Sequence, residues 1–288
     1  MDIDPFLYVA LGLGVALGLV ARPNPRWVGR GTQGAILVLL FLLGASLTDV
    51  PIGDVGPAVL LSLLLVALIL AFTVAIALAL PRPATARTRA APPPPRESIG
   101  FSVALVAALF FGYGVGLAIA IPATATIEYA LYVLLFLVGL GLHLIGSVLR
   151  RVWAPIVAAS LGALAAGAIY SALTGLALSS SLALTFAFGW YSLDGPLVTA
   201  SLGASLGLIA FLANFLRENL TMLLAPTIGP RISGEGLTAM GGATSMDTTL
   251  YFVVRYGDPD AATLALASGL ILTIAASLVV PVFLALGA

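Results

Sequence analysis

The chain has 288 residues, of which 61% are hydrophobic and only 8% are charged, and its formal net charge is zero. A mean hydropathy of +1.15 excludes a water-soluble domain of this size, and the balanced charge gives no indication of nucleic-acid binding. Cysteine is absent, which excludes disulfides and thiolate chemistry. Because apolar runs of about 20 residues recur throughout, we expect an all-α polytopic membrane protein with a single membrane domain over residues 1–288.

Six apolar runs in the first part of the chain predict transmembrane helices. The first run follows acids and precedes arginines, which is the reverse of a secretory signal peptide, so we expect it to be retained as the first span. The predicted spans lie near residues 6–21, 31–48, 56–80, 99–121, 127–149 and 153–177.

All cationic side chains are arginine, and their distribution predicts the orientation in the plasma (inner) membrane. Arginines cluster after the first, third and fifth spans, whereas the loop between the second and third carries Asp49, Asp54 and no arginine. The positive-inside rule therefore places both termini outside. The proline- and arginine-rich stretch at 81–98 is predicted to be a cytoplasmic loop, extended or disordered.

Beyond residue 178 the apolar runs are interrupted by glycine, proline and hydroxyl residues. Segments 182–200 and 236–254 are predicted to be re-entrant or broken helices, because irregular backbone at membrane depth lines cavities in transport proteins. Segments 203–226 and 261–286 are predicted spans. If both interrupted segments re-enter, one from each face, the chain has about eight transmembrane helices; if both cross, it has ten. The pairing is compatible with inverted repeats, and we expect the functional site within 178–260.

The predicted span 203–226 carries a polar stripe. Asn214, Arg217, Glu218 and Thr221 follow one another at i, i+3, i+4 and i+7, which places them on one helix face. A charge deep in the bilayer costs about 2.5–3.5 kcal/mol on insertion scales, which favours a role for Glu218 in a substrate or proton path. The structural alternative is an ion pair of Arg217 with Glu218, but adjacent helical residues point about 100° apart, so we expect each to pair elsewhere.

A further acid, Asp247, lies in the sequence GGATSMDTT. Two glycines there allow the backbone to bend, and hydroxyl residues, including Thr244 and Ser245, surround the acid. We expect an unwound helix whose free N–H groups hold a substrate carboxylate while Asp247 holds a cation. The alternative is a glycine-kinked packing helix in which Asp247 caps the following turn.

The sequence GWYSLDGPL predicts a bend with aromatic walls. Trp190, Tyr191 and Ser192 precede Asp194, and aromatic faces can flank an ammonium group or an aliphatic stem. The alternative is a pair of interfacial aromatic residues next to an ordinary Asp-Gly-Pro turn.

Four motifs carry a resemblance to a known family. On these motifs, and on hydropathy over the whole chain, the sequence resembles the LysO family of lysine exporters. The motifs are FLVGLGLHL at 136–144, FGWYSLDGPLVT at 188–199, FLANFLRE at 211–218 and, the most specific, GGATSMDTTL at 241–250.

The resemblance implies export of L-lysine and its toxic analogue thialysine from the cytoplasm against inward proton flow, with the acids matching Glu218 and Asp247 both required. It also implies eight spans with outward termini, in agreement with the arginine distribution. The chain departs from the family pattern at two positions, since family members carry an acid where Asn214 stands and a small residue where Asp194 stands. This exchange bears on the choice of substrate.

Independently of the family, the charges fit a cationic substrate. Asp194, Glu218 and Asp247 against Arg217 leave two net negative charges if all are ionised, and neighbouring carboxylates in a low dielectric raise one another's affinity for protons. We therefore predict proton-coupled alternating access, with Glu218 and Asp247 binding protons and cations. The expected substrate-binding residues are Asp194, Asn214, Arg217, Trp190, Tyr191, Ser192, Thr244 and Ser245.

Two other functions are left open by the sequence. A monovalent-cation/proton antiporter would share broken helices and paired acids, although bare Na⁺ needs oxygen ligands rather than ring faces. An intramembrane aspartyl protease would use two acids as a dyad, whereas a serine protease would have only His143, in a plain apolar run. No HExxH motif or metal-ligand cluster occurs in the sequence. We expect no enzyme, no metal and no cofactor besides the coupling proton; the expected partners are a basic amino acid and membrane lipid, with the oligomeric state unassigned.

Overall fold

The computed structural model describes residues 5–21, 23–80, 96–119, 121–141, 152–257 and 261–287, and these residues are all-helical, without a strand. His143, nearly all of the predicted loop 81–98 and the end of the predicted span 127–149 lie outside the described residues. The long helices are α1 (Pro5–Ala21), α2 (Pro25–Ser46), α3 (Ile52–Ala79), α4 (Arg96–Ala118), α5 (Ala123–Gly141), α6 (Trp153–Thr174), α9 (Ala204–Ile228) and α12 (Ala261–Leu286).

Both segments that were predicted to be interrupted are broken helices. The first consists of α7 (Leu178–Thr185) and α8 (Tyr191–Leu202). The second consists of α10 (Gly234–Gly241), a 3₁₀ turn η4 (Gly242–Met246) and α11 (Leu250–Tyr256). The sequence therefore predicted the positions of these helices well, because glycines and prolines interrupt otherwise apolar runs.

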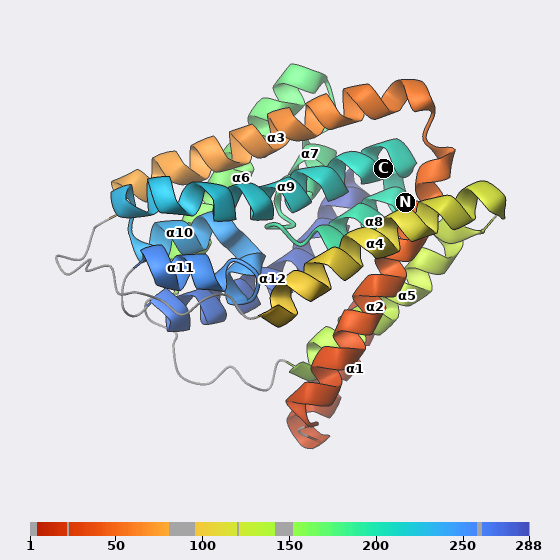
Figure 1. Ribbon diagram of the computed structural model, residues 1–288, viewed down its shortest axis with the longest axis horizontal. Coiled ribbons are helices and arrows are strands. Elements are labelled where there is room, and N and C mark those ends of the chain that lie inside the picture. The colour runs from red at the N-terminus through yellow and green to blue at the C-terminus, as the bar shows by residue number, and fades with distance from the viewer. Residues whose placement is uncertain are drawn as a thin grey trace.

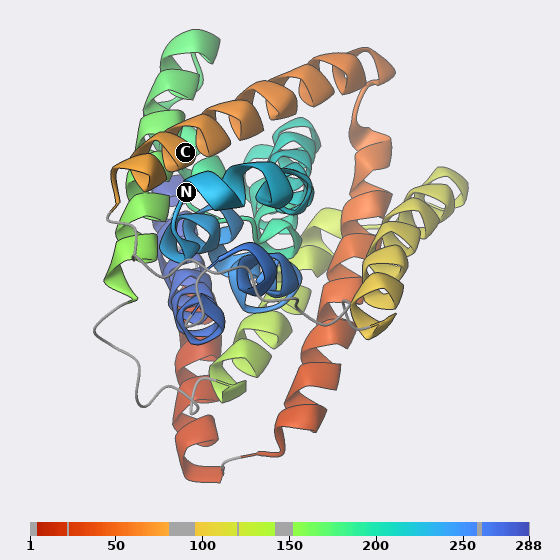
Figure 2. The same ribbon diagram turned by 60° about the vertical axis from the view of Figure 1, so that its left-hand side comes forward.

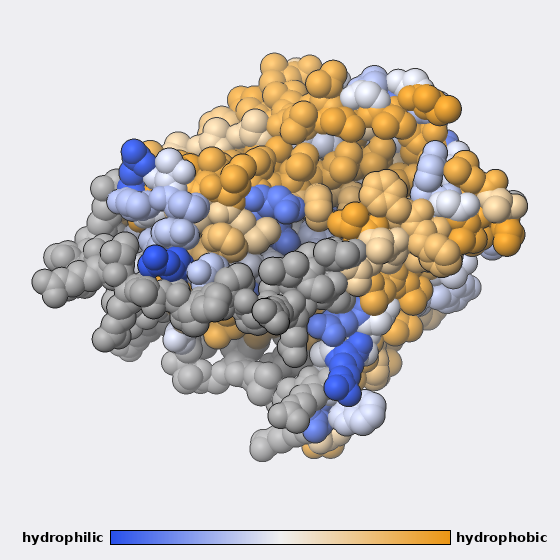
Figure 3. Space-filling model, in the orientation of Figure 1, coloured by the Kyte–Doolittle hydropathy of each residue, from blue (hydrophilic) through white to orange (hydrophobic). Residues whose placement is uncertain are grey.

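The described helices are those of a multi-pass membrane protein. Five of them are long and apolar enough to cross a bilayer, and α1 and parts of α4 and α5 are shorter apolar helices. Apolar side chains cover the visible face over α3 and much of α4, as lipid contact requires (Figure 3). The five long segments are Trp27–Asp49, Ile52–Ala79, Trp153–Thr174, Ala204–Arg231 and Ala261–Leu286.

Two groups of helices enclose the interrupted segments. Helix α1 packs on α5, and α2 packs on both α4 and α5; this group lies at the lower right in Figure 1. The second group consists of α3 and α6, which pack on each other. Helix α9 packs on α3 and also contacts α7, α8, α10 and α11. The turned view shows α9 and the broken helices in the interior, between the two groups (Figure 2).

Glycines set the closest helix contacts in the first group. A Cβ atom at Gly44 of α2 would lie 2.0 Å from the Leu109 carbonyl oxygen of α4, and one at Gly112 of α4 would lie 2.0 Å from the Phe41 carbonyl oxygen of α2. No larger residue fits at either position without moving a backbone. Such small-residue contacts are typical of helices that associate within lipid, where burial of apolar surface gives no driving force.

The ends of the second broken segment lie next to each other. A Cβ at Gly257, just after α11, would be 3.0 Å from the Gly234 Cα atom at the start of α10. Nearby, a Cβ at Gly236 would contact Ala77, at the end of α3. The chain therefore enters and leaves this segment at the same end of the molecule, beside the end of α3.

The first broken segment approaches from the opposite end. Residue Gly287, after the last helix, lies beside Ser179 and Ser180 at the start of α7. Helix α8 then runs antiparallel to α9, because Gly195 contacts Phe211 and Thr199 contacts Gly207.

Candidate functional site

The two breaks meet in the interior. Phe188 and Gly189, between α7 and α8, have φ angles of 53° and 93°, and Gly242, after α10, has a φ of 65°. The Ala243 backbone N–H donates to the Phe188 carbonyl oxygen at 2.9 Å. A Cβ at Gly242 would lie 2.3 Å from that same oxygen, so the contact requires glycine.

Helix α9 binds the end of α7 through Asn214. The Asn214 amide nitrogen donates to the Leu184 carbonyl oxygen at 3.1 Å, and its amide oxygen accepts from the Gly189 N–H at 2.9 Å. The same nitrogen donates to a carboxyl oxygen of Asp194 at 2.7 Å, while the other Asp194 oxygen is buried and has no hydrogen-bond partner among the described residues. The side chains of Asn214 and Asp194 are thus in direct contact.

Arg217, one turn further along α9, binds the end of α10. Its Nε donates to the Met240 carbonyl oxygen and its Nη2 to the Ala239 carbonyl oxygen, both at 3.0 Å. The Thr221 hydroxyl also donates to Met240, at 3.2 Å. A helix carries partial negative charge at its C-terminal end, so a guanidinium suits this position. Arg217 therefore pairs with backbone carbonyls rather than with Glu218, although its buried Nη1 finds no hydrogen-bond partner in the part of the chain that the structure describes.

Glu218 and Asp247 line the same cavity, which has a volume of about 490 Å³. Glu218 is only 3% exposed, whereas Asp247 is exposed toward the cavity. The two carboxylates are close enough to interact electrostatically, and the Thr248 side chain contacts both. The other cavity residues are Gly29, Thr32, Gln33, Ile36, Leu105, Gly189, Trp190, Tyr191, Ser192 and Thr244.

Asp247 does not cap the following helix. Its carboxylate accepts from the Thr248 N–H at 2.6 Å, and the N-cap position of α11 is Thr249, which makes no side-chain capping bond. The alternative interpretation, in which Asp247 caps the following turn, is therefore wrong. The carboxylate remains available to a ligand in the cavity.

The predicted substrate residues separate into two groups. Trp190, Tyr191, Ser192 and Thr244 line the cavity with the two acids. The other four do not line it, and all of them are fully buried: Asp194, Asn214, Arg217 and Ser245. The Ser245 hydroxyl donates to the Gly242 and Ala265 carbonyl oxygens and so ties the second break to α12.

The cavity wall from α2 and α4 was not predicted. Gly29, Thr32, Gln33 and Ile36 form one face of α2, and Leu105 belongs to α4. In the sequence, only Thr32 and Gln33 indicate this wall of the cavity, because polar residues near the start of an apolar span are typical of a solvated face.

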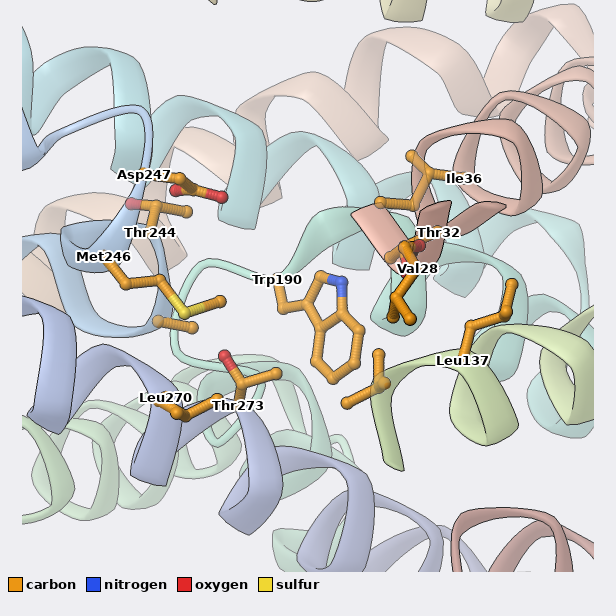
Figure 4. Close-up of a pocket in the computed structure, with 12 residues that line it drawn as sticks. Val28, Thr32, Ile36, Leu137, Trp190, Thr244, Met246, Asp247, Leu270 and Thr273 are labelled. Atoms are coloured by element: carbon orange, nitrogen blue, oxygen red, sulfur yellow. Dashed lines mark hydrogen bonds between the residues drawn. The ribbon is translucent and has the colours of Figure 1, made fainter. Parts of the chain in front are cut away.

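A smaller, mostly apolar cavity of about 220 Å³ adjoins the first (Figure 4). The two share Thr32, Ile36, Trp190, Thr244 and Asp247. Among the described residues, no group of three or more potential metal ligands occurs.

Comparison with known proteins identifies the family. The family described as lysine exporter LysO matches residues 103–284, which include both broken segments and α9. Lysine exporter LysO of Escherichia coli (strain K12) is 38% identical over 166 residues, or 55% of this chain and 53% of that protein. A putative lysine exporter of Haemophilus influenzae (strain ATCC 51907 / DSM 11121 / KW20 / Rd) is 29% identical over 149 residues, or 50% of this chain and 76% of that protein. The matched region thus spans about half the length of the Escherichia coli protein. The chain belongs to the LysO family of lysine exporters, whose members are transporters and not enzymes.

Proposed function

We propose that the protein exports L-lysine and thialysine from the cytoplasm across the plasma membrane in exchange for protons. The observation that carries this proposal is the pair of carboxylates, Glu218 and Asp247, that face one cavity inside a helical membrane domain. The names of the relatives support lysine as the substrate.

Charge complementarity favours a dibasic substrate. At neutral pH lysine carries two ammonium groups and one carboxylate. Two neighbouring carboxylates inside a membrane domain need compensating positive charge, which either protons or ammonium groups supply. Protons and substrate therefore compete for Glu218 and Asp247, and this competition is the basis of antiport.

The rest of the cavity suits the uncharged parts of such a substrate. Trp190 and Tyr191 offer ring faces to an ammonium group or an aliphatic stem, and Ser192 and Thr244 offer hydroxyls. The volume lies in the range of about 300–1,000 Å³ that is usual for small-ligand pockets. We assign the four buried residues that do not line the cavity a positioning role, because their hydrogen bonds hold the two breaks.

Eight spans with two re-entrant hairpins are the topology that these contacts favour. The second broken segment begins and ends at one end of the molecule, and the first begins beside the end of α12 and returns antiparallel to α9. With the arginine-rich ends inside, both termini lie outside. The cavity is lined by the first half of α2, which starts at the arginine-rich end, so we infer that it opens toward the cytoplasm.

A monovalent-cation/proton antiporter is the second candidate. Paired acids would serve it equally well, but the Trp190 ring and the apolar side chains that line both cavities offer nothing to a bare cation, which needs oxygen ligands. A comparison of lysine with sodium and potassium in liposomes distinguishes lysine export from cation exchange.

The test uses purified protein in liposomes that contain a pH-sensitive dye. Lysine, thialysine, sodium or potassium is added to one side, and proton movement is recorded. We expect lysine and thialysine to drive proton movement, and both Glu218→Gln and Asp247→Asn to abolish it. Export at the normal rate by these two variants, or a response to sodium or potassium alone, would contradict the proposal.

Asp54→Asn provides the matched control. This acid is exposed in the first turn of α3, outside the cavity, so the same change from carboxylate to amide should leave transport unaltered.

A further inference from the structure

The apolar cavity beside Asp247 has no role in the transport of lysine proposed above. Figure 4 shows the Trp190 ring in the middle of its lining residues, between α2 and the chain segments that carry Thr244 and Thr273. The cavity is lined by Val28, Thr32, Ile36, Leu137, Val138, Trp190, Ala243, Thr244, Met246, Leu270, Thr273 and Asp247.

The lining determines which chemical group can enter. Among the described residues that line it, Asp247 is the only one with an ionisable side chain, and it lies where the apolar cavity meets the larger, polar one. The ammonium and carboxylate groups of an amino acid need polar partners, which the polar cavity supplies. A group that enters the apolar cavity must therefore be uncharged and apolar, while a cationic end attached to it can remain at Asp247.

We propose that this cavity is a subsite for the alkyl or aryl arm of a primary amine whose ammonium group binds Asp247. The inference rests on Asp247 as a cation-binding residue, which is part of the proposed function. The arm packs against the Trp190 ring and against apolar side chains of α2, α5 and α12. Amines of this class then compete with basic amino acids for the same carboxylate.

The length of the arm gives a quantitative expectation. Each methylene group that moves from water into an apolar site strengthens binding by about fourfold. Affinity should therefore rise along a series of straight-chain amines and stop rising when the arm fills the 220 Å³ cavity. An amine bound only through its charge would show no such dependence on length.

Trp190 provides a direct readout. The chain has three tryptophans, and the other two, Trp27 and Trp153, are 72% and 57% exposed, so both can be replaced by phenylalanine. The full-length double variant, reconstituted in lipid nanodiscs, is titrated with primary amines from ethylamine to octylamine while Trp190 fluorescence is recorded. We expect saturable changes whose midpoints fall by about fourfold per methylene over the shorter members.

Partition of amines into the bilayer also increases with length, so the decisive comparison uses variants that fill the cavity. Val138→Phe and Leu270→Phe each add volume from a different helix and no charge. We expect each of these variants to reduce the gain in amine affinity to less than twofold per methylene. Lysine should displace ethylamine from both variants as it does from the parent protein. A full dependence on length in both filled variants would overturn the inference.

The charged anchor is tested with matched ligands. Asp247→Asn should abolish amine binding at every length, and straight-chain alcohols of the same lengths should bind at least tenfold more weakly than the amines. Equal binding of alcohols and amines would show that the ammonium group has no anchor and would also overturn the inference.

The outcomes separate this inference from the proposed function. If the amine series behaves as expected while lysine neither displaces amines nor drives protons, the subsite stands and lysine export fails. If lysine drives protons while the amine midpoints do not change with length, export stands and the subsite fails.

Discussion

Neighbouring residues on α9 have different tasks because each step along a helix turns by about 100°. Asn214 and Arg217 face the carbonyl ends of the broken helices, while Glu218, one position further, faces the cavity. The polar stripe therefore contains residues that hold the broken helices in place as well as a residue that lines the cavity. The spacing alone placed these residues on one face but could not assign their partners, which come from segments distant in the chain.

The first residue-scale prediction concerns Arg217. Arg217→Gln removes charge-assisted hydrogen bonds to two buried carbonyl oxygens at the end of α10, each worth about 1.5–3 kcal/mol. We expect the free energy of unfolding to fall by at least about 2 kcal/mol, measured by denaturant titration in detergent micelles. Arg231→Gln is the control, because Arg231 is exposed and donates to the Thr227 carbonyl oxygen four residues before it; an equal loss in both variants would refute the assignment.

The second concerns the buried pair Asp194 and Asn214. Asn214→Asp places two carboxylates together and takes the amide donor away from Leu184, so we expect a loss of about 3 kcal/mol or more in stability. Asp194→Asn replaces a buried carboxyl group with an amide that can still form hydrogen bonds, so stability should be unchanged or higher. Thermal unfolding of both variants tests this order of stability. An Asn214→Asp protein that is more stable than the Asp194→Asn protein would contradict it.

At the scale of elements, the breaks depend on glycine where two backbones touch. Gly242 combines a positive φ with a contact to the Phe188 carbonyl oxygen that leaves no room for a side chain. The sequence predicted that this region is unwound, since GG followed by hydroxyl residues disfavours a helix. It could not predict that the first break is the partner, because the contact joins segments about 50 residues apart.

Gly242→Ala tests the importance of that contact. We expect a loss of about 1–3 kcal/mol from backbone strain and a loss of lysine transport, since the Phe188 backbone must move. Gly34→Ala in α2, where a Cβ would meet nothing within 4 Å, should be neutral or should stabilise the helix by about 0.5–1 kcal/mol. Paired measurements of thermal stability and proton-coupled uptake into vesicles would decide; wild-type transport by Gly242→Ala would rule out the role.

At the scale of the whole molecule, composition and hydropathy predicted a polytopic helical protein, and helix positions followed from the apolar runs. The part that sequence could not predict is the α2 wall of the cavity. Gly29 and Ile36 look like any lipid-facing residues, and the polar Thr32 and Gln33 do not indicate which other helices share their cavity.

The topology is open to a direct test because the chain has no cysteine, so any introduced thiol is unique. If both broken segments are re-entrant, Ala177→Cys and Ser205→Cys should react with a membrane-impermeant thiol reagent from outside the cell. Arg231→Cys and Tyr256→Cys should react only after the membrane is permeabilised. Labelling of Ala177→Cys and Ser205→Cys from opposite faces would instead establish ten crossings.

The attachment of both breaks to α9 has a mechanical consequence. One side chain of this helix holds the end of α7, and another, a turn away, holds the end of α10. Any slide or rotation of α9 disturbs both attachments together, so the two broken helices are mechanically coupled through this one helix. In the proton exchange proposed above, such coupling would oppose a proton leak, because neither broken helix could be displaced while the other stays in place.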